Sequence, residues 1–449
     1  MTPEPNRNGC GTRTARNFLL SKARSDAVPR ASGAGEADGT AEALRRAFPH
    51  LLGGKSLLVR AMSRLEEVPE FATAVIQIDA DRPADHPPAA ERDPAVPITL
   101  ARALETACRS ASGLWGLLDS TTFGYFLPGG TPSTAVAPLK TIEKTVAEAS
   151  GATVTIGMAF FPTLDFPREA ILENARKALE HAKFFGPGSR VAFDAISLNI
   201  SGDSLYDQGE YQKAIEEYET ALRLDPANAN LHNSLGVCYG VTGEFTQAMA
   251  RFKEAMALDA AEALAHYNAG LVHLLLDERD KARAHLLEVD NRPHNLFEVR
   301  LQLGKLYLED GQPGLARVYL ENAAATWPQS STVHCLLGEC YAALDLTGDA
   351  VAAYKKSLRL NANDAAALSG LGWLYHALGQ NTDIATLYCR HSTAIAPQNG
   401  LFHHRLGCLC LKQDQLVEAR DAFRAAEALG CDSAAQLAEV ENRLLDIAS

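Results

Sequence analysis

The side chains best suited to bind a metal ion lie near the C-terminus, where Cys408 and Cys410 stand beside His403 and His404. Thiolates and imidazoles are common zinc ligands, but they must converge on one point. This stretch has a helical pattern, and residues i and i+2 of a helix do not share a face. We therefore predict no metal site and no cofactor here. The sequence also contains no Ser/His/Asp, Walker or zinc motif that would indicate another enzyme.

Composition narrows the class of partner. Residues 1–197 contain 22 Lys+Arg and 22 Asp+Glu, so the remaining residues contain 42 − 22 = 20 and 55 − 22 = 33. This acidic excess argues against nucleic-acid binding and favours a partner with basic patches. The nine cysteines are odd in number and irregularly spaced, which predicts reduced thiols and a cytoplasmic protein. We find no apolar run long enough for a membrane span, and no secretory signal.

Glycines recur with a fixed period from residue 198 onward, which is typical of a solenoid of repeats. They are Gly202, Gly236, Gly270, Gly304, Gly338, Gly372 and, after one extra residue, Gly407. Small residues follow twelve positions later, at Ala214, Ala248, Ala282, Ala316, Ala350, Ile384 or Ala385, and Ala419. Small side chains let the two helices of a repeat approach closely. One repeat cannot bury its apolar face alone, so the repeats are stabilised by stacking on their neighbours.

The recurring glycines and small residues resemble the pattern of the tetratricopeptide repeat (TPR) family, in seven copies over residues 198–430. The sixth copy holds the extra residue, so we expect its second helix to be bulged or shifted. Residues 431–449 are expected to form a capping helix, with Leu437, Val440, Leu444 and Leu445 on one side.

The resemblance implies a concave binding surface made by the first helix of each repeat, which would hold a protein or peptide. The outward positions on these helices include Asn199, Asn233, Tyr267, Lys305, Glu339, Trp373 and His404. Trp373 could anchor a partner, or it could pack on a neighbouring repeat.

Residues 1–40 have no apolar period and are predicted to be disordered. Residues 41–197 alternate helices and strands around one hairpin, which predicts an α/β domain with one mixed sheet. Helices are expected at 55–65, 98–111, 138–150 and 167–185, strands at 71–81, 153–162 and 190–196, and the hairpin at 113–129. No linker separates this domain from the first repeat, so we expect the two to pack together.

The order of these elements, with "QIDAD", "VTIGMAFFP" and "ARKALEHAKFFGPGSRV", resembles the diguanylate-cyclase (GGDEF) domain, a nucleotidyl-cyclase or ferredoxin-like fold. The family's signature is Gly-Gly-Asp-Glu-Phe on the central hairpin. Here that turn reads Asp119, Ser120, Thr121, Thr122 and Phe123. Threonine hydroxyls cannot supply the negative charge that holds Mg²⁺. Asp79 and Asp81 stand where the resemblance puts another metal ligand, and we read them as vestigial.

Three functions follow from this sequence. We favour a non-catalytic bacterial signalling scaffold, in which the degenerate cyclase-like domain is a regulatory or structural module and the repeats bind partner proteins. One alternative is a sensor that binds GTP or cyclic di-GMP and controls the repeats. The other is an active cyclase, which the loss of the acidic pair disfavours.

Overall fold

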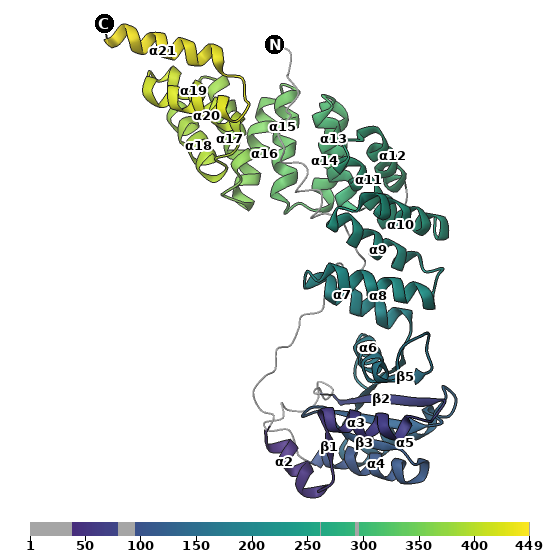
Figure 1. The fold of residues 1–449 in the computed structure, drawn as a ribbon. Helices are drawn as coiled ribbons and strands as arrows, with labels where there is room; N and C mark the ends of the chain where they lie inside the picture. The colour runs from purple at the N-terminus through teal and green to yellow at the C-terminus, as the bar shows by residue number, and fades with distance from the viewer. Residues whose placement is uncertain (1–37, 80–94, 261, 292–295, 449) are drawn as a thin grey trace. The chain divides into compact units, whose positions relative to one another are not determined.

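The computed structural model describes residues 38–79, 95–260, 262–291 and 296–448. The chain divides into two compact units between Ala265 and His266. The first unit contains an α/β domain followed by two helix pairs, and the second contains further pairs and a final helix (Figure 1). The predicted boundary after residue 197 is therefore not where the units divide. Helix α6 of the α/β domain packs against α7 of the first repeat, which keeps both in one unit.

The α/β domain is built on a mixed sheet in the order β1-β3-β4-β2-β5-β6. Its strands are β1 (Leu52–Gly53), β2 (Phe71–Ile78), β3 (Leu114–Leu117), β4 (Thr122–Pro128), β5 (Val154–Phe161) and β6 (Arg190–Ala192). Strand β2 pairs antiparallel with β4 and β5, while the outer pairs β1–β3 and β5–β6 are parallel. The apolar strands β4 and β2 lie at the centre with β5 beside β2, and most residues of these three strands are buried, as in a sheet whose two faces are both covered.

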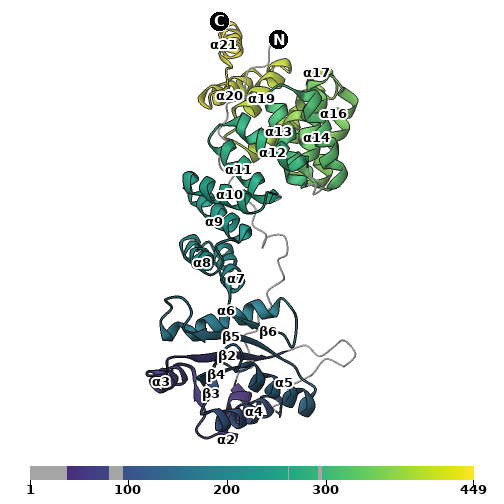
Figure 2. The ribbon, with the colours of Figure 1, turned by 90° about the vertical axis from the view of Figure 1, so that its right-hand side faces the viewer.

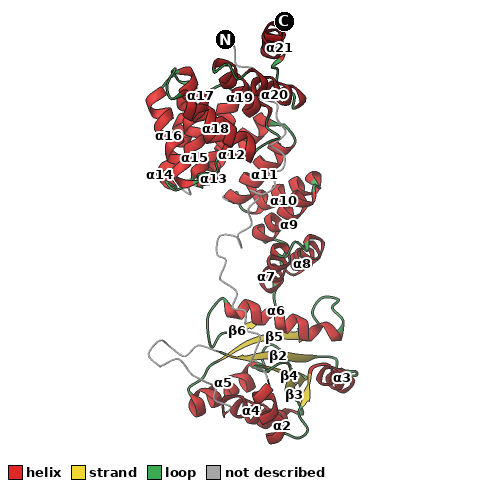
Figure 3. Ribbon diagram, turned by 90° about the vertical axis from the view of Figure 1, so that its left-hand side faces the viewer, coloured by secondary structure: helices red, strands yellow, loops and turns green. Residues whose placement is uncertain are grey.

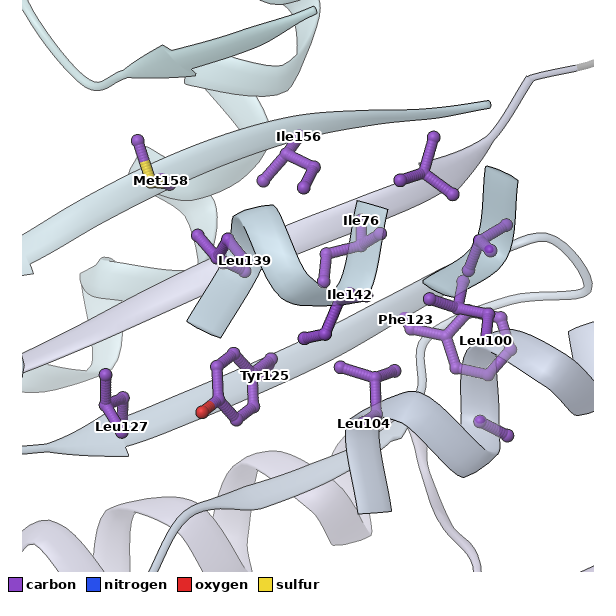
Figure 4. Packing of buried hydrophobic residues seen from close by; sticks show 14 of the residues in the cluster. Ile76, Leu100, Leu104, Phe123, Tyr125, Leu127, Leu139, Ile142, Ile156 and Met158 are labelled. Carbon is purple, nitrogen blue, oxygen red and sulfur yellow. The ribbon is translucent and has the colours of Figure 1, made fainter. Parts of the chain in front are cut away.

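Helices cover both faces of this sheet (Figure 3). They are α2 (Asp38–Ala47), α3 (Gly54–Leu65), α4 (Ala95–Ala111), α5 (Val136–Ser150) and α6 (Ile171–Lys183), preceded by a 3-10 turn at Arg168–Ala170. On the α4/α5 face, Ile76, Phe123 and Tyr125 pack against Leu100 and Leu139 (Figure 4). The predicted mixed sheet with helices is confirmed. Helix α2, which begins three residues before the predicted domain start, and strand β1 were not predicted.

Gly157 in β5 is required by the packing of α6 on the sheet. A Cβ atom there would lie 2.1 Å from the backbone nitrogen of Leu179 and 2.2 Å from the carbonyl oxygen of Ala175. These are backbone atoms of α6, so no side-chain rotation could relieve the clash. The glycine therefore sets the distance between β5 and α6.

After residue 194 the chain forms helix pairs that follow the glycine period (Figure 2). The first helices of the pairs are α7 (Ala195–Asp207), α9 (Ala229–Thr242), α11 (Ala263–Leu275), α13 (Phe297–Glu309), α15 (Ser331–Ala343), α17 (Ala365–Ala377) and α19 (Gly400–Lys412). The second helices are α8 (Tyr211–Leu224), α10 (Phe245–Leu258), α12 (Arg279–Asp290), α14 (Pro313–Thr326), α16 (Thr347–Leu360), α18 (Thr382–Ile395) and α20 (Leu416–Ala428).

Turns within the pairs adopt the left-handed backbone region. Gly209 and Gly243 have φ of 81° and 91° there, whereas Asp277, Asp345 and Asp414 take the same role with φ near 60°. Aspartate tolerates this region better than most residues because its short side chain can bond locally. The turn glycine is therefore replaceable in alternate repeats without loss of the helix pair.

The last repeats differ in two details from what the sequence predicts. The extra residue of the sixth repeat lies in the turn before α18, where Asn381 has φ of 49°, so α18 begins one residue later than the other second helices and is shifted as expected, without a bulge. Ala385, fully buried, takes the small-residue position, while Ile384 is exposed. In the final helix α21 (Ala434–Ala448), Val440 is buried but Leu445 is 67% exposed, so Leu445 lies outside the packed side. None of the described helices is long and apolar enough to cross a membrane.

Candidate functional site

The Asp79 carboxylate, at the end of β2, is occupied by hydrogen bonds from the protein. Its Oδ1 accepts from the Thr155 hydroxyl at 2.6 Å, and its Oδ2 accepts from the Thr153 hydroxyl at 2.6 Å. Oδ2 also accepts from the backbone N–H of Gly188 at 2.9 Å. Asp79 therefore ties β2 to β5 and to the turn before β6. A carboxylate used in this way has little capacity left for a cation.

The turn between β3 and β4 is organised by its own first residue. Asp119 Oδ1 accepts from the backbone N–H of Thr121 at 3.0 Å, and the hydroxyl of Thr121 lies 3.4 Å away. Ser120 is half-buried, Thr122 is buried, and Phe123 is fully buried in the core as a packing residue. The turn thus lies beside the end of β2, since Ile78 N–H donates to the Thr121 carbonyl.

Metal binding has no support among the described residues. No group of three or more His, Cys, Asp or Glu side chains within them is arranged to hold a metal ion. Asp81 lies outside the described residues, so the second vestigial position has no structural account. Asp79 and Asp119, the acidic residues of this edge that are described, both accept hydrogen bonds from the protein itself.

The predicted binding positions on the first helices of the repeats differ in accessibility. Asn233 and Tyr267 are fully buried, so the prediction that they are accessible is wrong. Periodicity along one helix cannot reveal that a neighbouring helix covers that position. Asn199 is half-buried, and its amide nitrogen donates to Asp203 Oδ2 at 3.2 Å.

An accessible face in the second unit runs over α13, α15, α17 and α19, which pack in succession. We call it the helix-A face. On it Lys305 is half-exposed, with its ammonium 3.8 Å from Glu309. Glu339 is exposed, and within the described chain it has no hydrogen bond or ion pair.

Trp373 contributes the aromatic part of the helix-A face. The Arg405 guanidinium lies 5.9 Å from the centre of the Trp373 ring, within cation–π range. Arg405 also donates to the hydroxyl of the fully buried Ser369 at 3.0 Å. Trp373 itself is half-buried and stacks near His376, at 5.1 Å between ring centres. Trp373 therefore packs on the next repeat through Arg405 and still presents surface to solvent.

His404 is not arranged as a catalytic base. Its Nδ1 is 2.7 Å from the Ser433 hydroxyl, and its Nε2 is 3.6 Å from Cys408 Sγ. Burial lowers the pKa of His404, and burial raises the pKa of Cys408 to about 11. A thiol nucleophile needs the opposite shifts, which would yield thiolate and imidazolium. The pair is therefore a neutral structural contact.

A recurring contact that sequence reasoning missed involves histidine and proline. The Nε2–H groups of His232, His334 and His403 donate to the carbonyls of Pro226, Pro328 and Pro397 at 3.0–3.1 Å. In each case the proline is six residues before the histidine. Proline ends the preceding helix, and the histidine satisfies a carbonyl that the helix end leaves open. The shared spacing was visible in the sequence and could have revealed this contact.

Family models identify the repeats. The model described as TPR repeat matches residues 202–240, and the model described as tetratricopeptide repeat matches residues 301–365. The chain therefore carries tetratricopeptide repeats. Neither match reaches the α/β domain. The comparison with curated proteins finds no match.

Several solved structures are similar to this chain. YrrB, described as a TPR protein with an unusual peptide-binding site, is 20% identical, with a TM-score of 0.38; the match covers 42% of this chain and 96% of YrrB. PilF of Pseudomonas aeruginosa is 20% identical, with a TM-score of 0.43, and the match covers 46% of this chain and 94% of PilF. A tetratricopeptide repeat protein from Parabacteroides merdae is 17% identical, with a TM-score of 0.42, and the match covers 55% of this chain and 96% of that protein.

Proposed function

We propose that this protein is a non-catalytic scaffold that binds partner proteins along the first helices of its tetratricopeptide repeats. The observation that carries the proposal is the accessible arrangement of Trp373 and Arg405 on the helix-A face. Tryptophan and arginine are the residue types most enriched among those that dominate binding energy. Ser369 holds the guanidinium in place, so little side-chain entropy is lost when a partner binds.

We further propose that the α/β domain is a degenerate diguanylate-cyclase-like domain with a structural or regulatory role. The resemblance in sequence, the central position of β2 and the turn beside its end support this assignment. Thr121 and Thr122 stand where the family has its acidic pair, and the Asp79 carboxylate is already bound by protein donors. Both features favour a domain without catalysis in a cytoplasmic signalling protein, and they count against the nucleotide-sensor alternative.

A capture experiment with matched variants tests the scaffold proposal. Full-length wild-type protein is immobilised and exposed to lysate of the organism that encodes it, and bound proteins are identified by mass spectrometry. The test variant is Trp373→Ser with Arg405→Ser. The control is Leu387→Ser on α18, which removes a 60%-exposed apolar side chain from a second helix.

A partner retained by wild type and by Leu387→Ser, but lost with the double variant, supports binding at the helix-A face. Equal capture by all three proteins would contradict the proposed surface. Circular dichroism of each variant confirms that lost capture does not reflect lost folding.

A further inference from the structure

We draw no further inference here: the strongest candidate, the small cavity between strands β2, β4 and β5 and helix α5 at which the buried hydroxyl of Tyr125 has no hydrogen-bond partner in the described chain, carries no ligand, because its other walls are mostly alanine, leucine and methionine side chains and it has room for about one water molecule.

Discussion

Lys177 of α6 and Glu217 of α8 form an ion pair with 2.5 Å between Nζ and Oε1, and their side chains are only 15% and 19% exposed. The pair joins the α/β domain to the first repeat. Beside it, the His181 ring of α6 lies 3.3 Å from the Ser197 hydroxyl of α7. The sheet domain thus covers the first helix pair as a preceding repeat would, which is the role of a cap in repeat arrays.

The first prediction concerns this ion pair. Removing one partner leaves a buried charge uncompensated, so Lys177→Ala should reduce the free energy of unfolding of the first unit by about 3 kcal/mol. Urea unfolding of the full chain, followed by circular dichroism, measures the loss. The control is Lys213→Ala, whose ion pair with Glu210 is 64% and 52% exposed and should contribute less than about 1 kcal/mol. Equal effects of the two substitutions would show that the junction is not stabilised by Lys177.

The second prediction separates a structural Asp79 from a nucleotide site. Asp79→Ala removes the acceptor for Thr153, Thr155 and Gly188, so it should cost about 3 kcal/mol or more of stability. Wild-type protein should show no rise in melting temperature with Mg²⁺ and GTP or cyclic di-GMP. A ligand at 100 times its Kd would add about 2.7 kcal/mol, which is readily measured. A clear rise would revive the sensor alternative, and loss of that rise in Asp79→Ala would assign the site.

The third prediction tests the spacing between β5 and α6. Gly157→Ala places a Cβ within 2.2 Å of α6 backbone atoms, so the helix must shift, and we expect a loss of about 3 kcal/mol or more. Gly314→Ala is the matched control, because a Cβ there meets nothing within 4 Å. That change should stabilise α14 by up to about 1 kcal/mol. Thermal unfolding of both variants gives the comparison, and a neutral Gly157→Ala would contradict the packing described.

The repeat array was predictable because one constraint, close approach of paired helices, recurs with a fixed period. Gly202 and Gly338 both lie against a tyrosine ring of the second helix, as their spacing implies. Accessibility at other positions was not predictable in this way. Asn233 and Tyr267 are on the predicted face of their helices, yet neighbouring helices bury them. That burial depends on how successive repeats stack, which no single helix encodes.

The candidate sites, too, were predictable from the sequence in part only. The turn at Asp119 was found from its polar residues between two apolar runs. The hydrogen bonds of Asp79 were not, because Thr153 and Thr155 approach it only through the pairing of β2 with β5, more than 70 residues later in the sequence. The hydrogen bond from Tyr218 of α8 to Asp203 of α7 was missed for a similar reason. The Tyr218 ring reaches Asp203 because Gly202 leaves room for it beside α7.

The last prediction concerns pH and the histidine–proline contact. Burial lowers the pKa of His334, and its Nε2–H donates to the Pro328 carbonyl at 3.0 Å. Because the folded-state pKa lies below the unfolded value, the unfolded chain binds a proton first as the pH falls. The contribution of His334 to stability is therefore present above its unfolded pKa of about 6.5 and is lost as the pH falls toward the folded value. His334→Ala should cost about 1 kcal/mol at pH 7.5 through the lost hydrogen bond. The difference in unfolding free energy between wild type and His334→Ala should then shrink at pH 5.5. Urea unfolding at both pH values measures it, and a difference that grows on acidification would show that the ring is held protonated.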